Sequence, residues 1–385
     1  MYKRELKVGK KYSFFLFGPR QVGKSTFLKQ EFKESETLYY DFLKNEEYIK
    51  YSSDTTLFRK EVIHRNKSTK YIIVDEVQRI PEILNEVHYL LENTDAPPLF
   101  CLSGSSARKL KRFNSNMLGG RALTLYMYPL SYKEIGNDFN LEKALRFGTL
   151  PKIYSEENLE FCKDLLRSYT ETYLQQEIKA EALIRNINGF IRFLKIAAEN
   201  NGEIINYTNI GRETGNDRNT VKEFFQVLED TLVGFYLFPF SKSARKRLVS
   251  HPKFYFFDLG VTRALQGNLN LDIQSGTFVF GKAFEHFLIL ELIKFSKLHK
   301  KDIDFSFYRT SAGAEVDLII EIPGKQRHAV EIKASSNPSL SNLKGLKSFL
   351  EIDPKAKLVC TALLTKRYVD NGILFVPWQE LFELL

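Results

Sequence analysis

The segment GPRQVGKST, residues 18–26, decides the fold of the N-terminal part because it fits the pattern G-x-x-x-x-G-K-[ST] in full. The apolar run Tyr12 to Phe17 precedes it as a buried strand would, and Phe27 and Leu28 follow among charged neighbours as a helix would. A strand, a glycine-containing loop and a helix in this order predict a P-loop, whose backbone N–H groups and helix N-terminus face a polyphosphate.

Several residues of this loop have a direct chemical role in the predicted site. Gly18 and Gly23 let the backbone approach a polyphosphate closely, Lys24 would reach the β- and γ-phosphates, and the Ser25 hydroxyl would bind Mg²⁺. The alternative is a glycine-containing turn that binds nothing, but the flanking strand and helix favour ATP binding. The expected contacts come from Gly18, Pro19, Arg20, Gln21, Val22, Gly23, Lys24, Ser25 and Thr26.

Length and composition indicate a folded protein of two or three domains. Of the 385 residues, 43% are hydrophobic and 14% aromatic, and the formal net charge of +9 favours polyanionic partners such as nucleic acid. Cys101, Cys162 and Cys360 lack the spacing of a zinc site or a disulfide framework. With neither a signal-type segment nor 18 uninterrupted apolar residues, we expect a cytoplasmic protein with no membrane partner.

A second motif lies in YIIVDEVQRIP, residues 71–81, where an apolar run ends in two carboxylates. Beside a P-loop, Asp75 would hold Mg²⁺ through water, and Glu76 would orient or deprotonate the attacking water. The alternative is an ordinary strand end followed by a helix cap. The P-loop about fifty residues upstream favours the catalytic interpretation.

Two further polar residues are candidates for the same site. Ser103 follows the apolar run Leu99 to Leu102, and strand ends gather on one edge of a parallel sheet, so its hydroxyl could sense the γ-phosphate or the water. A helix N-cap by one of the serines that follow is the alternative. Arg121 follows a flexible glycine pair and is either a nucleotide contact, made in cis or from a neighbouring subunit, or part of a surface salt bridge.

Together, GPRQVGKST, IIVDEVQRIP, LSGSSARKL, GGRA and RFGTLPKIY resemble a family of AAA+ superfamily ATPases of bacteria and archaea, over nearly the whole chain. In that family a domain catalogued as of unknown function follows the ATPase core. The resemblance implies ATP and Mg²⁺ as cofactors and, because many such ATPases act as rings, a homo-oligomer in the active state. The family usually has two glycines before Leu-Pro, where this chain has Gly148-Thr149.

The middle of the chain predicts a helical connector and then a winged helix. Tyr207 to Thr214 and Thr220 to Leu232 have the pattern of a helix-turn-helix, and two β-rich segments follow with a basic loop between them. The alternative is a module for domain or subunit packing with a solvated basic loop. If the module reads DNA, Arg218, Asn219 and Lys222 would face the groove, and Lys242, Arg245, Lys246 and Arg247 would meet phosphates.

The C-terminal third contains a second acidic motif. Glu285 lies in the apolar stripe of a helix from Gly281 to Lys297, where a carboxylate is costly unless it is paired or binds a metal. In the strands AEVDLIIEI and HAVEIKAS, strict alternation places Asp317 and Glu331 opposite each other across a hairpin, with Lys333 beside them. Two facing carboxylates repel, so they predict a divalent metal between them.

This order of a helix Glu, a strand Asp and a Glu-x-Lys resembles the PD-(D/E)xK restriction-endonuclease-like nucleases. Glu285, Asp317, Glu331 and Lys333 stand on the motif positions, and the resemblance implies Asp317 and Glu331 as Mg²⁺ ligands. A solvated acidic hairpin face is the alternative, and such a domain can also persist as a binding module without cleavage.

The sequence therefore predicts an α/β fold: a P-loop AAA+ type parallel-sheet core, a helical lid, a winged helix and an α/β restriction-endonuclease-like domain. We expect an ATP-hydrolysing protein that remodels or translocates on DNA, branched DNA by analogy, with Mg²⁺-dependent cleavage as a further hypothesis. The alternative is a nucleotide-switched binding, defence or signalling protein without strand chemistry. The expected domains are residues 1–140, 141–186, 187–265 and 266–385.

Overall fold

The apolar runs around the P-loop form one five-stranded parallel sheet with the strand order β2-β3-β4-β1-β5. The computed structural model describes residues 2–105, 118–174, 187–243, 251–340 and 343–385. Because the strands are parallel, their carboxyl ends meet at one edge, where the P-loop, Asp75 and Ser103 lie. The strands are β1 (Ser13–Phe17), β2 (Thr37–Asp41), β3 (Tyr71–Asp75), β4 (Leu99–Gly104) and β5 (Ala122–Tyr126).

Alternate residues of β1 face the two sides of this sheet. Phe15 and Phe17 join one apolar core, whereas Phe14 and Leu16 join a second core that continues into the middle of the chain. The cysteines are free thiols, all buried. The helices of this part are α1 (Lys24–Glu31), α2 (Asn45–Ser53), α3 (Thr56–Ile63), α4 (Ile83–Asn93) and the short α6 (Tyr132–Ile135).

The middle of the chain forms helices and one antiparallel hairpin. Helix α12 ends at Gly215, whose φ of 69° is left-handed, and the Asp217 carboxylate caps α13 by accepting from the N–H groups of Asn219 and Thr220. The elements are α7 (Leu141–Phe147), α8 (Pro151–Tyr154), α9 (Leu159–Ser168), a π-helical segment (Tyr169–Leu174), α11 (Ile187–Glu199), α12 (Tyr207–Thr214), α13 (Arg218–Asp230), β6 (Gly234–Leu237), β7 (Lys253–Phe256) and α15 (Leu259–Leu265).

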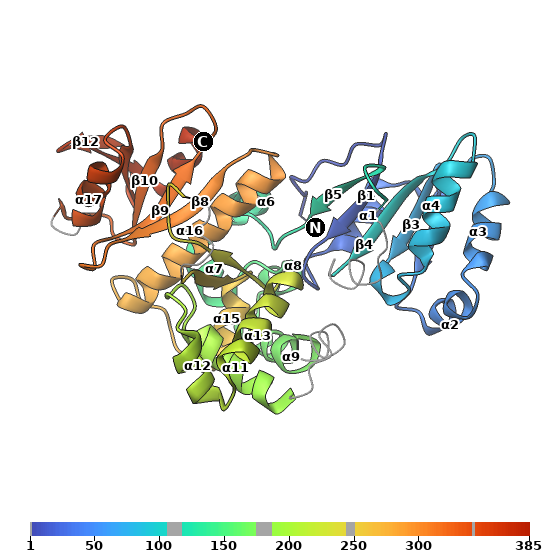
Figure 1. Ribbon diagram of the computed structural model, residues 1–385, viewed down its shortest axis with the longest axis horizontal. Helices are drawn as coiled ribbons and strands as arrows, with labels where there is room; N and C mark the ends of the chain where they lie inside the picture. The colour runs from blue at the N-terminus through green and yellow to red at the C-terminus, as the bar shows by residue number, and fades with distance from the viewer. Residues whose placement is uncertain (1, 106–117, 175–186, 244–250, 341–342) are drawn as a thin grey trace.

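A mixed sheet of six strands, in the order β12-β13-β11-β10-β9-β8, forms the C-terminal part. Helix α16 packs on one face of this sheet and α17 on the other. Figure 1 shows the two large sheets at opposite ends of the longest axis of the molecule. The elements are α16 (Phe278–Leu298), β8 (Asp304–Arg309), β9 (Glu315–Glu321), β10 (His328–Lys333), α17 (Lys344–Ile352), β11 (Lys357–Ala362), β12 (Tyr368–Asp370) and β13 (Ile373–Pro377).

Helix α16 is long enough to span a bilayer by length alone, with 21 residues, but it carries charged side chains that are buried among protein. Across the described parts of the chain, no helix combines the length and the apolar character that a membrane span requires.

A β-bulge in β9 breaks the strict alternation expected for this strand, so that expectation is wrong. Where β8 advances from Ser306 to Tyr308, β9 runs from Ile319 to Val316, and β9 therefore carries one extra residue. As a result Val316 and Ile319 join the core beneath α17, whereas Leu318 joins the core beneath α16.

The hairpin of the middle region is hydrogen-bonded to the C-terminal sheet. The Phe240 N–H donates to the Phe307 carbonyl oxygen at 2.6 Å, and the Phe307 N–H donates to the Phe238 carbonyl oxygen at 3.1 Å. Phe307 belongs to β8, so the chain that continues from β6 runs beside this strand. The hairpin and the C-terminal sheet are thus held in a fixed relation by backbone bonds.

Candidate functional site

A cavity of about 810 Å³ lies beside the P-loop. Glu76 lies in its wall together with most of the P-loop. This volume falls in the range of pockets that enclose small ligands and cofactors. The predicted ATP contacts that line the cavity are Arg20, Gln21, Val22, Gly23, Lys24, Ser25 and Thr26.

The loop geometry explains both motif glycines. Gly23 has a φ of 96°, a conformation that favours glycine, and helix α1 begins at the next residue. A Cβ on Gly18 would lie 2.2 Å from the Met127 carbonyl oxygen, so any side chain would collide with the backbone there. The Lys24 ammonium is buried and donates to the carbonyl oxygens of Gly18 at 2.8 Å and Pro19 at 3.1 Å.

Neutral hydroxyl groups hold the buried Asp75 carboxylate behind this cavity. Its Oδ1 accepts from Ser103 Oγ, and its Oδ2 accepts from the Tyr39 hydroxyl at 2.6 Å. Burial and the adjacent Asp75 raise the pKa of Tyr39, which keeps the phenol protonated as a donor. Ser25 and Asp75 offer a hydroxyl and a carboxylate, and hard oxygen donors of this kind fit Mg²⁺.

Glu76 adopts an unusual backbone conformation with a φ of 59°, which non-glycine residues seldom take. Its side chain is held by Gln78, whose Nε2 donates to Glu76 Oε2 at 2.5 Å and to Ser105 Oγ at 2.9 Å. The Glu76 N–H also donates to Ser103 Oγ at 3.4 Å. Strained residues of this type cluster at functional sites, so the geometry is compatible with the predicted catalytic role.

The sequence interpretation missed Tyr39 and Gln78. Tyr39 lies within β2, where only an apolar strand pattern is visible, and its partner Asp75 belongs to the adjacent strand. Gln78 stands two residues after Glu76 inside the quoted motif, and a polar residue so close to a catalytic candidate was the signal that the sequence offered. The structure shows that Gln78 is buried.

The opposite wall of the cavity comes from segments distant in sequence. Tyr2 and Arg4 precede the first strand, and Asp138 follows α6. Lys152 belongs to α8, and Ser155 directly follows this helix. Part of the stretch RFGTLPKIY, which the family resemblance gave no role, therefore lies beside the nucleotide cavity. The N-terminal segment and α8 therefore complete the wall of the cavity.

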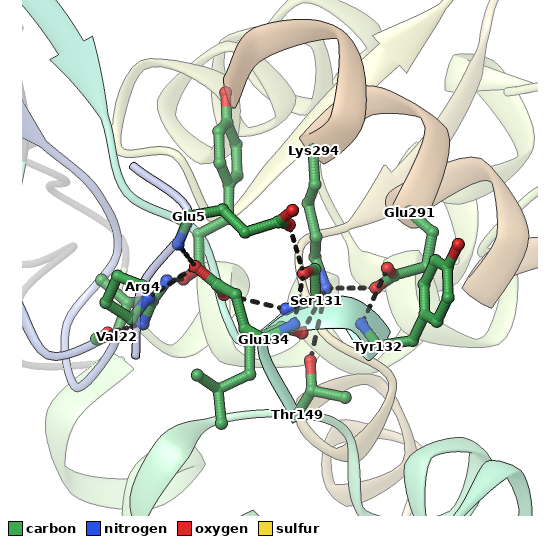
Figure 2. Close-up of polar contacts among 11 residues, drawn as sticks. Arg4, Glu5, Val22, Ser131, Tyr132, Glu134, Thr149, Glu291 and Lys294 are labelled. Atoms are coloured by element: carbon green, nitrogen blue, oxygen red, sulfur yellow. Dashed lines mark hydrogen bonds and ion pairs between the residues drawn. The ribbon is translucent and has the colours of Figure 1, made fainter. Parts of the chain in front are cut away.

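Arg4 connects the P-loop to the segment before α6, as Figure 2 shows. Its guanidinium donates to the carbonyl oxygens of Val22 at 2.9 Å and Tyr128 at 2.6 Å, and its Nε donates to Glu134 Oε1 at 2.9 Å. Glu134 in turn forms a capping box with Ser131 at the start of α6. The P-loop, the N-terminal segment and α6 are therefore joined by one polar network.

A buried ion pair continues this network onto α16 (Figure 2). The Lys294 ammonium donates to Glu291 Oε1 at 2.8 Å and to the Leu130 carbonyl oxygen at 2.9 Å, and Glu291 Oε2 accepts from the Tyr132 N–H at 3.0 Å. Lys294 also donates to Thr149 Oγ1 at 3.3 Å. Burial raises the pKa of Glu291, and Lys294 opposes that rise. The long C-terminal helix is thus anchored beside the nucleotide-binding part.

Arg121 does not lie in the nucleotide cavity. It precedes β5, whose first residue Ala122 pairs with Ser13, so it is at the sheet edge opposite the P-loop. Its guanidinium pairs with Glu92 Oε1 at 2.7 Å on the exposed surface. The contact in cis is therefore not formed, and the structure has the surface salt bridge that was the alternative.

The four predicted C-terminal residues come together with a lysine and a tyrosine that the sequence interpretation missed. Lys333 pairs with Glu331 Oε1 at 2.6 Å, and Asp317 Oδ2 accepts from the Ile332 N–H at 2.7 Å. Glu285 Oε1 accepts from the Tyr255 hydroxyl at 2.8 Å and lies 3.8 Å from the buried Lys253 ammonium. We call this set, completed by Glu315, the acidic site. Its members are Lys253, Tyr255, Glu285, Glu315, Asp317, Glu331 and Lys333.

The Asp317 and Glu331 carboxylates are electrostatically coupled. Burial raises the pKa of Asp317 well above its usual range, and the neighbouring Glu331 raises it further. Glu331 Oε2 is buried without a hydrogen-bond partner among the described residues. An orphaned carboxylate oxygen beside a second carboxylate fits one divalent cation completed by water. Within the described ranges, no group of three or more His, Cys, Asp or Glu side chains could hold a metal.

Four of the seven predicted DNA contacts lie within the described residues, and all four are exposed. Arg218, Asn219 and Lys222 are exposed at the start of α13, and Lys242 is exposed after the hairpin strand β6. The Lys222 ammonium lies 5.5 Å from the centre of the Tyr207 ring. The remaining predicted phosphate contacts, Arg245, Lys246 and Arg247, lie outside the described residues.

Three protein families match successive parts of the chain. Residues 10–136 match an AAA domain, residues 138–272 a domain of unknown function (DUF8612), and residues 280–381 another domain of unknown function (DUF4143). The chain therefore carries an AAA-type domain followed by two domains of unknown function. Neither of the latter two descriptions names a winged helix or a nuclease.

Relatives occur in bacteria and archaea. An uncharacterized protein of Mycobacterium tuberculosis is 24% identical over 85% of this chain and 71% of its own length. An uncharacterized protein of Methanocaldococcus jannaschii is 23% identical over 93% of this chain and 82% of its own length. Both matches cover most of this chain, and neither relative's name gives an activity.

One solved structure that matches this chain is domain III of the Thermotoga maritima replication initiation protein DnaA. It covers 58% of this chain and 85% of its own, with 14% identity and a TM-score of 0.26. A similarity at that level carries no argument about function.

Proposed function

We propose that this protein hydrolyses ATP and uses the energy to remodel DNA or translocate on it. The observation that carries the proposal is the cavity in which most of the P-loop and Glu76 meet. Lys24 would contact the β- and γ-phosphates, Ser25 and, through water, Asp75 would hold Mg²⁺, and Glu76 would orient or deprotonate the attacking water. Bound Mg²⁺ would supply charge neutralisation on the phosphates.

DNA is the proposed partner because α12, α13 and the β6–β7 hairpin have the element order of a winged helix. In this interpretation Arg218, Asn219 and Lys222 would meet base edges from the exposed start of α13. Lys242 would contact phosphate. The net charge of +9 supports a polyanionic partner.

Two finer parts of the proposal concern assembly and cleavage. In an oligomer, Arg121 would contact the nucleotide of a neighbouring subunit, since it cannot reach its own. In the acidic site, Asp317 and Glu331 would hold Mg²⁺ and Lys333 would stabilise developing charge on a phosphate, which would make the C-terminal part a nuclease of the PD-(D/E)xK type. Branched DNA is the proposed substrate by analogy.

The test is an ATPase assay of the full chain with linear, single-stranded and four-way DNA at low salt. We expect DNA to stimulate turnover and the stimulation to fall steeply with added salt, because phosphate contacts release counterions. The double variant Arg218→Ala and Lys222→Ala should lose most of the stimulation. Lys60→Ala, which removes an exposed charge from α3, should keep it. Absence of stimulation by every DNA would overturn the proposal.

A second candidate is a nucleotide-switched binding protein without strand chemistry. It is favoured by the ion pairs of the acidic site, in which lysines already neutralise part of the carboxylate charge. Incubation of the four-way and linear DNA with Mg²⁺ tests the cleavage part, and nicking that survives Lys24→Ala and disappears with Asp317→Asn supports the nuclease. The second candidate is supported if no DNA is nicked and no DNA stimulates ATP turnover.

A further inference from the structure

Strand β7 of the middle hairpin contributes two side chains to the acidic site. Phe254 and Phe256 pack into the core of the middle region, while Lys253 and Tyr255 point the other way. This alternation is that of an ordinary strand with two different faces. One face holds the helices of the middle region, and the other forms a wall of the acidic site.

Lys253 is an internal cation of this site. Its side chain is only 2% exposed, its ammonium lies 2.6 Å from Glu315 Oε1 and 3.8 Å from Glu285 Oε1, and the Phe307 ring is 5.2 Å away. A buried ammonium is costly unless anions compensate for its lost hydration. The two carboxylates supply that compensation, and the ammonium offsets one of their two negative charges. Arg309, 3.3 Å from Glu315 Oε2, adds a second positive charge at the exposed side.

The backbone fixes the position of Lys253. β7 pairs with β6, and Lys253 also forms a bridge to Ile204. The continuation of β6 is bonded to Phe307 of β8, the strand next to β9. The backbone of Lys253 is therefore fixed by strand pairing, and its buried side chain holds the ammonium inside the acidic site.

We propose that Lys253 offsets part of the charge of Glu285 and Glu315 and thereby restricts a divalent cation to the Asp317–Glu331 pair. Lys253 is then a specificity-determining residue of the acidic site, supplied by the hairpin of a different region. Glu285 becomes a residue that positions α16 through Tyr255 and Lys253, and it does not ligate the cation. The proposal rests on the cation site in the proposed function and deepens it.

Two isosteric variants test the division of roles. Mn²⁺ binding to the full chain is measured without nucleotide, by electron paramagnetic resonance or calorimetry. Glu331→Gln should weaken binding at least about tenfold because it removes a ligand charge in direct contact, whereas Glu285→Gln should change it less than about threefold. Equal losses in the two variants would make Glu285 a ligand and overturn the proposal.

Removal of the Lys253 ammonium should change the Mn²⁺ affinity in the opposite direction, toward tighter binding. Lys253→Met removes the buried ammonium that Glu285 and Glu315 share and leaves them only the partly exposed Lys282 and Arg309. Mn²⁺ should therefore bind at least about tenfold more tightly and raise the melting temperature more than in the wild type. The matched control is Lys282→Met, since Lys282 is one-third exposed and lies 3.9 Å from Glu285 Oε2. The control should change the affinity less than about threefold. A folded Lys253→Met variant with unchanged Mn²⁺ affinity would overturn the proposal.

A further variant, Asp317→Asn, distinguishes failure of the proposed function from failure of the role of Lys253. If the wild type and Asp317→Asn bind Mn²⁺ equally, the pair is not the cation site and the proposed nuclease fails. If Asp317→Asn abolishes binding but Glu285→Gln abolishes it equally, the cation site stands and the role of Lys253 fails.

Discussion

The nucleotide cavity and the acidic site both place carboxylates at a sheet, but they stabilise them differently. In the nucleotide cavity Asp75 accepts hydrogen bonds from the neutral hydroxyls of Ser103 and Tyr39, and the Gln78 amide donates to Glu76. In the acidic site the partners include lysine ammonium groups. Neutral donors hold a carboxylate in place and leave its charge for a metal or a water, whereas an ammonium cancels that charge.

The two sites also differ in how the chain builds them. In the first, nine consecutive residues of the P-loop supply most of the predicted phosphate contacts, and Glu76 after β3 and more distant segments complete the cavity. The second collects residues from β7, α16, β9 and β10, which lie up to eighty residues apart in the chain. A site of that kind depends on packing between regions, and it should respond to changes at their junctions.

The largest expected effect is on turnover in the nucleotide cavity. Glu76→Gln keeps the shape of the side chain but removes the base, so we expect kcat to fall at least about 100-fold. Nucleotide affinity, measured by calorimetry, should stay within about threefold. The exposed Glu46→Gln on α2 serves as control and should retain full turnover. An active Glu76→Gln enzyme would show that Glu76 neither deprotonates nor orients the attacking water.

The next effect is on the junction that joins the two regions. Lys294→Met leaves Glu291 buried without its cation, which should lower the free energy of unfolding by about 3–5 kcal/mol. Denaturant unfolding measures this loss. Lys297→Met, on the exposed side of the same helix, should cost less than about 0.5 kcal/mol. Equal stabilities for the two variants would remove the claim that the buried pair anchors α16.

His286, next to Glu285 on α16, predicts a pH dependence of stability. Its Nε2 donates to the Phe256 carbonyl oxygen at 2.6 Å, and burial lowers its pKa to about 4. The unfolded pKa is about 6.5, so this contribution is present above pH 6.5 and is lost as pH falls toward 4, up to about 3 kcal/mol.

Denaturant unfolding at pH 7 and pH 5 measures the contribution of His286 to the free energy of unfolding. His286→Asn should be less stable at pH 7 and should show a smaller difference between the two pH values. His299→Asn, at an exposed histidine after α16, should retain the wild-type difference. An unchanged pH dependence in His286→Asn would assign the effect to other groups.

The smallest effect concerns Arg121. Its pair with Glu92 is exposed, with about 44% of the arginine side chain accessible, so Arg121→Ala should cost less than about 1 kcal/mol of stability. Turnover in dilute protein should be unchanged, and a loss confined to concentrations at which subunits associate would support a contact in trans. A loss in dilute monomer would instead require that the arginine reaches its own nucleotide.

Much of the fold follows from sequence periodicity, but several features do not. The strand β5 escaped the prediction because its apolar side chains, including the exposed Leu123, do not form a continuous buried run. The bulge in β9 left no mark on the alternating pattern, because an extra residue is defined only against the partner strand β8. Helix α15 also lay outside the predicted elements.

By itself, the sequence determined the P-loop, the strand that ends in Asp75 and Glu76, and the residue types of the acidic motif, because these depend on short-range spacing. Only the tertiary structure decided that Tyr39 and Gln78 hold the two carboxylates, that Arg121 lies at the opposite sheet edge, and that Lys253 enters the acidic site. The reason is physical: hydrogen bonds and ion pairs between distant segments require the strands to be placed side by side, and no local pattern records which strands those will be.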